Sequence, residues 1–149
     1  MKVIVGSDHA GFAAKQALVE ELKKAGHSVT DAGTEGIESV DYPDFAIQVG
    51  RAVAESEAER GILICGTGIG MCMTANKIRG VRAAVVTDAF TAEMSRRHND
   101  ANVLCLGARV LTQQKIEELA RIFLEAQFEG GRHAGRVQKI KNLEDPSGA

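Results

Sequence analysis

Residues 61–70 have the sequence Gly-Ile-Leu-Ile-Cys-Gly-Thr-Gly-Ile-Gly. The apolar run over residues 62–65 begins after one glycine and ends before another, which predicts a short, fully buried strand. The glycines that follow predict a tight loop, and the residues beyond them predict a helix that extends to about Lys77. A buried strand that passes through a loop directly into a helix is the repeating unit of a parallel β-sheet.

The same alternation of strand and helix runs along the rest of the chain. Further strands are predicted at residues 2–6, 28–31, 82–86 and 102–106, which are rich in β-branched and apolar residues. Helices are predicted over residues 11–25, from Pro43 past Val53, over residues 89–97, after a Thr112 cap, and over residues 132–140. We therefore expect an α/β fold, a three-layer α/β/α sandwich with a five-stranded parallel, Rossmann-like sheet.

Length and composition narrow the possible functions. The 149 residues suffice for one well-buried domain, which we expect over residues 1–143, with a frayed tail over residues 144–149. Lys and Arg number 18 against 20 Asp and Glu, and Trp is absent, so nothing favours nucleic-acid binding. No apolar run is long enough for a membrane span, and we expect a cytoplasmic protein. The three cysteines and four histidines lack metal-ligand spacing, so no metal site is predicted.

Candidate binding residues follow the carboxyl ends of the predicted strands, where parallel sheets bind their ligands. Asp8 and His9 follow the first strand, Cys65 ends the third, and Arg109 follows the fifth. The loop over residues 66–70 can direct several backbone N–H groups at one point, which suits a phosphate, a carboxylate or a developing oxyanion. The sequence therefore predicts an anion site at this edge of the sheet.

Cys65 has two possible interpretations. A thiol at a strand end, beside backbone amides, can be stabilised as a thiolate and act as a base or nucleophile. A cysteine there can equally be a buried structural residue. Cys72 and Cys105 fall inside a predicted helix and strand and are expected to be core residues. The loop is not a dinucleotide-binding fingerprint, because the third glycine of G-x-G-x-x-G would fall at Met71.

The cationic residues of the second half of the chain are also ambiguous. Arg132 and Arg136 are four residues apart, so on a helix they share a face and could hold one phosphate. Arginines at this spacing are nevertheless more often simply solvent-exposed, and Arg109 has the same two interpretations. His98 ends a predicted helix, where the helix dipole favours a cationic side chain.

Six segments, in order along the chain, carry a more specific signal. They are GSDHAGF (6–12), DYP (41–43), ICGTGIG (64–70), ANK (75–77), SRRHNDANVL (95–104) and EGGRH (129–133). With these segments the chain resembles, from residue 1 to about 143, the type B ribose-5-phosphate isomerases. That family also includes allose- and galactose-phosphate isomerases.

The resemblance implies a role for each candidate residue. Cys65 matches the general base that moves a proton between C1 and C2 of the open-chain sugar, and the Thr67 hydroxyl belongs to the anion hole of the loop. His98 matches the acid/base that opens the furanose ring. One branch of the family has a glutamate in place of Met71 and lacks the cysteine, so the branch with a cysteine base is implied here. The implied substrate-binding residues are Asp8, His9, Gly66, Gly68, Ile69, Gly70, Asn99, Arg109, Arg132 and Arg136, with the arginines as phosphate partners.

The implied activity is interconversion of D-ribose 5-phosphate and D-ribulose 5-phosphate through an enediolate, a step of the pentose phosphate pathway that needs no metal or other cofactor. The alternatives are isomerisation of allose 6-phosphate or another hexose phosphate, and a non-catalytic sugar-phosphate sensor. The resemblance also implies a homo-oligomer, a dimer or tetramer, with active sites shared between subunits. In it we expect His98, Asn99 and Arg109 to approach the glycine loop of a partner chain.

Overall fold

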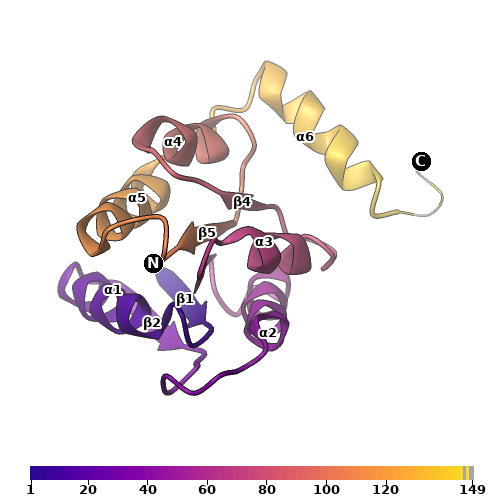
Figure 1. The fold of residues 1–149 in the computed structure, drawn as a ribbon. Helices are drawn as coiled ribbons and strands as arrows, with labels where there is room; N and C mark the ends of the chain where they lie inside the picture. The colour runs from indigo at the N-terminus through magenta and orange to yellow at the C-terminus, as the bar shows by residue number, and fades with distance from the viewer. Residues whose placement is uncertain (146, 148–149) are drawn as a thin grey trace.

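The computed structural model describes residues 1–145 and 147. Its sheet is parallel with the strand order β2-β1-β3-β5-β4, and helices cover both of its faces (Figure 1). The strands are β1 (Lys2–Ser7), β2 (Ser28–Asp31), β3 (Arg60–Cys65), β4 (Ala83–Val85) and β5 (Val103–Gly107). The helices are α1 (Phe12–Lys24), α2 (Tyr42–Ala54), α3 (Ile69–Ala75), α4 (Ala89–Arg97), α5 (Gln113–Glu125) and α6 (Arg132–Asn142). The predicted three-layer α/β/α sandwich with a five-stranded parallel sheet is confirmed.

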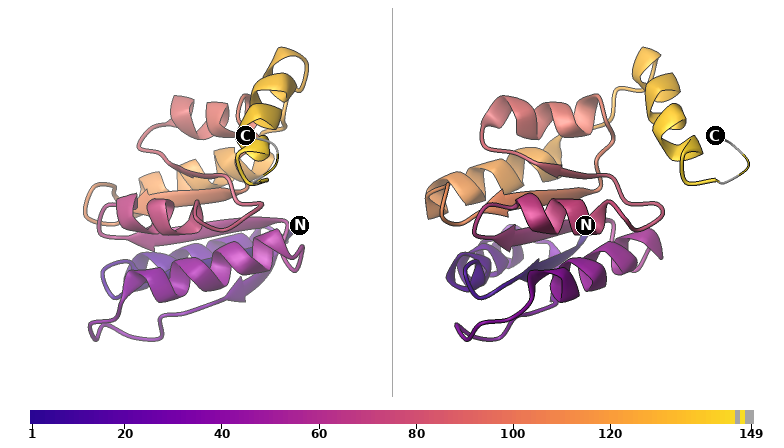
Figure 2. Two further views of the ribbon diagram at one scale, coloured as in Figure 1. Left: turned by 90° about the vertical axis from the view of Figure 1, so that its right-hand side faces the viewer. Right: turned by 45° about the vertical axis from the view of Figure 1, so that its right-hand side comes forward.

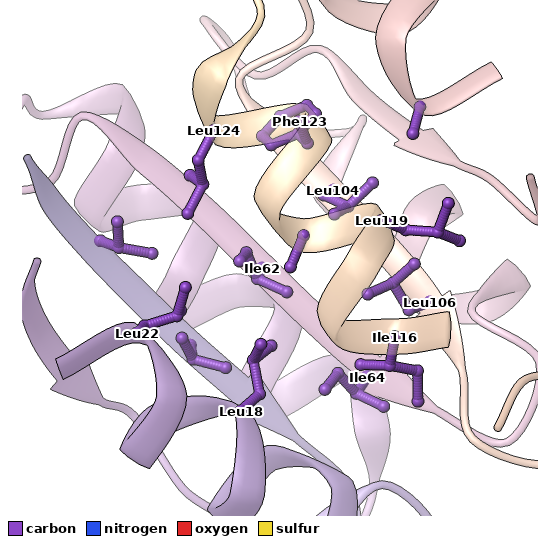
Figure 3. Close-up of a cluster of buried hydrophobic side chains, with 14 of the residues drawn as sticks. Leu18, Leu22, Ile62, Ile64, Leu104, Leu106, Ile116, Leu119, Phe123 and Leu124 are labelled. Carbon is purple, nitrogen blue, oxygen red and sulfur yellow. The ribbon is translucent and has the colours of Figure 1, made fainter. Parts of the chain in front are cut away.

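Alternate residues of the central strand β3 belong to two different core clusters. Ile62 and Ile64 pack with apolar side chains of α1 and α5 (Figure 3). Leu63 and Cys65 face the other way and pack with residues of α2 and α3. Both faces of β3 are therefore buried, which explains its continuous apolar sequence. The same alternation places the side chain of Cys65 on the α2/α3 side of the sheet.

The predicted boundaries differ from the structure mainly around β4. The Arg82 N–H, expected to belong to this strand, donates to the side-chain oxygen of Asn102 at 2.8 Å instead of to a neighbouring strand. Pairing with β5 therefore begins only at Ala83. Helix α3 ends at Ala75, two residues before the predicted Lys77, and the Asn76 side chain bonds the Ala83 backbone in both directions at 2.9 and 2.8 Å.

Helix α6 stands apart from the sandwich in Figure 1 and in the right-hand view of Figure 2. His133 and Val137 are its buried residues, whereas Ile140 and Leu143 near its end are exposed. The frayed tail expected over residues 144–149 includes residues 146 and 148–149, which lie outside the described residues. No helix in the described part of the chain is both long and apolar enough to cross a bilayer.

Candidate active site

The glycine loop is built around the sulfur of Cys65. Strand β3 ends at Cys65 and α3 begins at Ile69, so only three residues make the connection. The turn requires a left-handed backbone at Gly68, where φ is +80°, and a side chain is disfavoured there. This conformation points the Gly68 N–H at the Cys65 sulfur, to which it donates at 3.1 Å. The Cys65 sulfur is therefore the acceptor of a backbone amide hydrogen from the loop.

The Cys65 side chain lies at the boundary between core and loop. The residue is 5% exposed and belongs to the core cluster that includes Leu63 and Met71. Its sulfur thus packs against apolar atoms on one side and accepts an amide hydrogen on the other. The structure combines features of both sequence interpretations, a buried cysteine and a thiol placed beside hydrogen-bond donors.

Thr67 and Ile69 form the outer surface of the loop. Both are exposed, and the Thr67 hydroxyl oxygen accepts the Ile69 N–H at 3.2 Å. Gly66 and Gly70 are half-buried, and the ring of Tyr42 from α2 covers Gly70 so closely that no side chain fits there. The loop therefore presents its exposed backbone and one hydroxyl group away from the sheet.

Asp8 and His9 lie at the same edge of the sheet as this loop. The Asp8 N–H donates to the carbonyl of Ile64 at 3.2 Å, so Asp8 is adjacent to the end of β3. Its buried carboxylate accepts the Gly11 N–H at 3.0 Å. Nδ1 of His9 accepts the Val40 N–H at 3.2 Å. Both side chains are held in fixed positions by backbone groups next to the loop.

Arg109 contacts the loop of its own chain. Its N–H donates to the Gly66 carbonyl at 3.0 Å. A Cβ atom on Gly66 would lie 3.3 Å from the Arg109 guanidinium, so the arginine side chain lies directly over the loop. Asp8, His9, residues 65–70 and Arg109 form one assembly, here called the cysteine group.

The remaining predicted residues lie at the opposite edge of the sheet. Helix α4 connects two parallel strands, so it runs back from the carboxyl edge, and His98 and Asn99 follow its end. Asn99 lines a cavity of about 680 Å³ together with Arg82 and Ala83 at the start of β4. His98 stacks on His133, which brings the beginning of α6 to this edge.

The start of α6 contributes two exposed arginines, Arg132 and Arg136, which flank His133 in the sequence. We call His98, Asn99, Arg132 and Arg136 the histidine group. Within one chain the structure thus assembles the predicted residues into two groups rather than into one.

Sequence reasoning missed two residues of this edge, His133 and Glu129. Nε2 of His133 lies 3.4 Å from a carboxylate oxygen of Glu129. The pKa of His133 is lowered, first by burial of its ring and then by the positive charge of His98. The pKa of Glu129 is lowered by hydrogen bonds from Arg97. Glu129 and His133 are four residues apart, a spacing that brings two side chains together on a helix. Glu129 lies before the start of α6, however, so helical periodicity does not predict this contact.

Two further thiols lie behind the loop. Cys105 is fully buried in β5, as predicted, whereas Cys72 in α3 is half-buried and packs against the core from its edge. A hydrogen bond from Cys105 lowers the pKa of Cys72 to about 7. The same hydrogen bond and burial raise the pKa of Cys105 well above its ordinary value. Neither thiol belongs to the cysteine group.

Known proteins similar to this chain cover nearly its whole length. The ribose/galactose isomerase family matches residues 3–140. Ribose-5-phosphate isomerase B of Escherichia coli is 46% identical over 143 residues, which are 96% of each chain. A solved structure of ribose-5-phosphate isomerase B from Clostridium thermocellum has a TM-score of 0.97 and 50% identity, covering 99% of both chains. The enzyme of Mycoplasma genitalium with bound ribulose-5-phosphate has a TM-score of 0.94 and 44% identity, covering 97% of both.

The molecule is therefore a parallel α/β protein with a thiol and an amide-lined loop at the carboxyl edge of its sheet. It belongs to the ribose/galactose isomerase family.

Proposed function

We propose that this chain is a cytoplasmic aldose–ketose isomerase that interconverts D-ribose 5-phosphate and D-ribulose 5-phosphate. The observation that carries the proposal is the 3.1 Å hydrogen bond from the Gly68 N–H to the Cys65 sulfur. This hydrogen bond supports the proposal, because the reaction needs a base next to backbone donors. The similarity to a structure with bound ribulose-5-phosphate supports this choice of substrate.

The chemistry follows from the order of the loop residues. The Cys65 thiolate takes the proton from C2 of the open-chain aldose, the C–H electron pair forms the C1–C2 double bond, and the C1 oxygen becomes an oxyanion. Amides of the loop and the Thr67 hydroxyl stabilise this charge, and losing one such donor typically costs about 10²–10³ in turnover. The thiol then returns the proton to C1, and the O2 proton moves to the C1 oxyanion, so that C1 becomes CH2OH and C2 becomes the ketone carbonyl.

The histidine group acts on the other parts of the sugar. In the proposed reaction His98 opens the furanose ring before the proton transfer, because a closed ring has no carbonyl group at C1. Arg132 and Arg136, together with Arg109 of the cysteine group, bind the phosphate. Their contacts lie away from the reacting carbons, so they supply binding energy that positions the sugar.

We infer that a second copy of the chain completes each site. The cysteine and histidine groups lie at opposite edges of the sheet, so they act on one sugar only when they come from different chains. Strand β4 lies at the edge of the sheet, and exposed apolar residues lie on it and on the helices α3 and α4 that flank it in the sequence: Ile69 at 50%, Met73 at 65%, Val85 at 40% and Phe90 at 69% exposure. An edge strand with such a surface is suited to burial against a partner.

The test is an isomerase assay on ribose 5-phosphate with the wild type and Cys65→Ala side by side. Removing the base is expected to lower kcat by a factor of about 10²–10⁴. Circular dichroism and thermal unfolding verify that the variant remains folded. Cys72→Ala is the matched control, because it removes a nearby thiol that lies outside the cysteine group. Wild-type activity in Cys65→Ala would refute the assigned base.

The same assay separates the alternatives. A higher kcat/KM for allose 6-phosphate than for ribose 5-phosphate would replace the pentose with a hexose substrate. Binding of ribose 5-phosphate by calorimetry without turnover of either sugar would identify a sensor rather than an enzyme.

A further inference from the structure

Two histidine rings lie face to face where α4 ends and α6 begins. The ring centroids of His98 and His133 are 4.1 Å apart, and the ring planes differ by 10°. His98 is the C-terminal cap of α4 and is half-buried. His133 is only 6% exposed and lies in the first turn of α6. The stack is thus a contact between an accessible ring and a buried one that lies behind it.

The buried ring is fixed by a carboxylate. Nε2 of His133 lies 3.4 Å from Oε2 of Glu129. Nε of Arg97 donates to Oε1 of the same carboxylate at 2.7 Å, and the Glu129 N–H donates to the Arg97 carbonyl at 3.0 Å. Arg97 itself is held by Glu93 through a bond of 2.9 Å. The carboxylate facing His133 is therefore anchored to the residue that directly precedes His98.

The surroundings of His133 keep it neutral. Burial of its ring lowers its pKa, and the positive charges of His98, Arg132 and Arg136 lower it further, whereas Glu129 alone raises it. A neutral imidazole carries a single N–H, and Nε2 is the ring nitrogen that lies 3.4 Å from the Glu129 carboxylate. His98 therefore stacks on a neutral ring.

The cluster is poorly arranged as a metal site, although ligand atoms of His98, Glu129 and His133 lie within 4.8 Å of one another. Nearly parallel rings direct their nitrogen lone pairs along parallel planes, so the two lone pairs do not converge on one ion. One carboxylate oxygen of Glu129 is also occupied by Arg97. The geometry is better suited to holding the ring of His98 in one orientation.

We propose that His133 and Glu129 are positioning residues for ring opening, and that they hold the His98 imidazole through the stack. This role deepens the proposed isomerase function and rests on it. A general acid must lie within hydrogen-bond reach of the atom it protonates, and a displacement of about 1 Å can lower the rate about 10²-fold. Because these residues act only through His98, proton transfer by Cys65 does not need them.

Exchange of solvent deuterium into ribulose 5-phosphate separates ring opening from proton transfer. Ribose 5-phosphate is predominantly a closed furanose. Ribulose 5-phosphate has no free C5 hydroxyl group with which to close such a ring, so it is an open chain. Its C1 proton can exchange through the Cys65 thiol and the enediolate without any ring step, whereas net conversion between the two sugars passes through the ring step in both directions. A defect confined to ring opening therefore lowers net conversion and leaves this exchange unchanged.

The experiment measures net conversion of ribose 5-phosphate, and deuterium exchange into C1 of ribulose 5-phosphate by NMR, for the wild type, His133→Ala, His133→Phe and Glu129→Gln. We expect His133→Ala and Glu129→Gln to lower kcat/KM for net conversion by about tenfold to a hundredfold, with the exchange rate within about twofold of the wild type. His133→Phe retains a flat ring and is expected to recover part of the loss. Glu93→Gln is the matched control, because Glu93 also binds Arg97 but lies outside the contact with His133.

Each outcome has a distinct meaning. Equal losses of net conversion and of deuterium exchange, or no loss of either, would overturn the positioning role. If His133→Ala fails to fold, the ratio of the two rates in Glu129→Gln and His133→Phe decides the question. A wild type that converts neither sugar would instead refute the isomerase itself, and the positioning role with it.

Discussion

Gly107, the last residue of β5, packs its α-carbon directly against the backbone of Thr67. A Cβ atom on Gly107 would lie 2.8 Å from both the carbonyl carbon and the carbonyl oxygen of Thr67. Gly107 is also the parallel partner of Cys65 in the sheet. The glycine loop therefore packs directly on the backbone of β5 at Gly107. The position of the loop amides depends on the absence of a side chain at this residue.

Gly107→Ala is expected to displace the loop. Relieving the contact with Thr67 moves the loop away from β5, and misplaced amides are expected to lower kcat by at least about tenfold. Overpacking of this kind typically lowers the free energy of unfolding by about 1–3 kcal/mol. Initial rates and urea unfolding measure the two effects. Gly36→Ala is the control, since a Cβ there meets nothing within 4 Å, and wild-type kcat in Gly107→Ala would contradict the account.

The fold could be predicted because its signals are local. The apolar run of β3 and the glycines after it define one strand–loop–helix unit, and repetition of that unit implies a parallel sheet. The strand order could not be predicted in this way. It depends on which strands pair, and pairing is a contact between segments far apart in the sequence. Crossovers such as the placement of β5 between β3 and β4 leave no periodic pattern.

The site could be predicted only in part, for the same reason. Strand ends identified Asp8, Cys65 and Arg109, because parallel strands present their carboxyl ends at one edge. The contact of His133 with His98 joins residues 35 positions apart and has no periodic signal. Glu129 belongs to neither a strand nor a helix, so its anchoring of His133 became visible only from the structure.

Asp100 supports the turn that carries His98 and Asn99. Its carboxylate accepts hydrogen bonds from Arg96 at 2.8 Å and from Arg82 at 3.0 Å, and its backbone is left-handed with φ of 48°. The Arg96 side chain is only 3% exposed. Asp100→Ala leaves this buried guanidinium without its carboxylate partner and is expected to lower the free energy of unfolding by about 3 kcal/mol.

Urea unfolding tests the Asp100 prediction. Asp100→Asn keeps a hydrogen-bond acceptor and a residue that tolerates the left-handed backbone, so we expect a smaller loss than for alanine. Glu118→Ala breaks a half-exposed ion pair with Lys115 and is expected to change stability by less than about 1 kcal/mol. Equal effects of Asp100→Ala and Glu118→Ala would show that the Arg96 pair contributes no more than an ordinary surface pair.

His133 is expected to make the folded state sensitive to acid. Its pKa is lowered from 6.5 in the folded chain by burial of the ring. As the pH falls through 6.5, the unfolded chain therefore binds the proton before the folded chain does, and stability is lost. Chemical unfolding of the wild type and His133→Gln between about pH 5 and pH 8 measures this effect. The wild type should lose more stability toward low pH than the variant, and parallel curves would contradict the prediction.

Sharing of the active site between chains predicts that two inactive variants restore each other. A chain with Cys65→Ala has a damaged cysteine group and an intact histidine group, and a chain with His98→Asn has the reverse. A mixed dimer then contains one site with both defects and one site with neither. Random pairing of equal amounts makes half of the dimers mixed, so about one quarter of the wild-type activity should return.

Refolding the two variants together and assaying ribose 5-phosphate turnover measures the gain, while different affinity tags verify that mixed dimers form. Cys65→Ala refolded with Cys65→Ser is the matched control, because both chains are damaged in the same group and every site stays incomplete. Verified mixed dimers that remain inactive in the first pair would mean that each chain builds its site alone, and that the separation of the two groups across the sheet has another purpose.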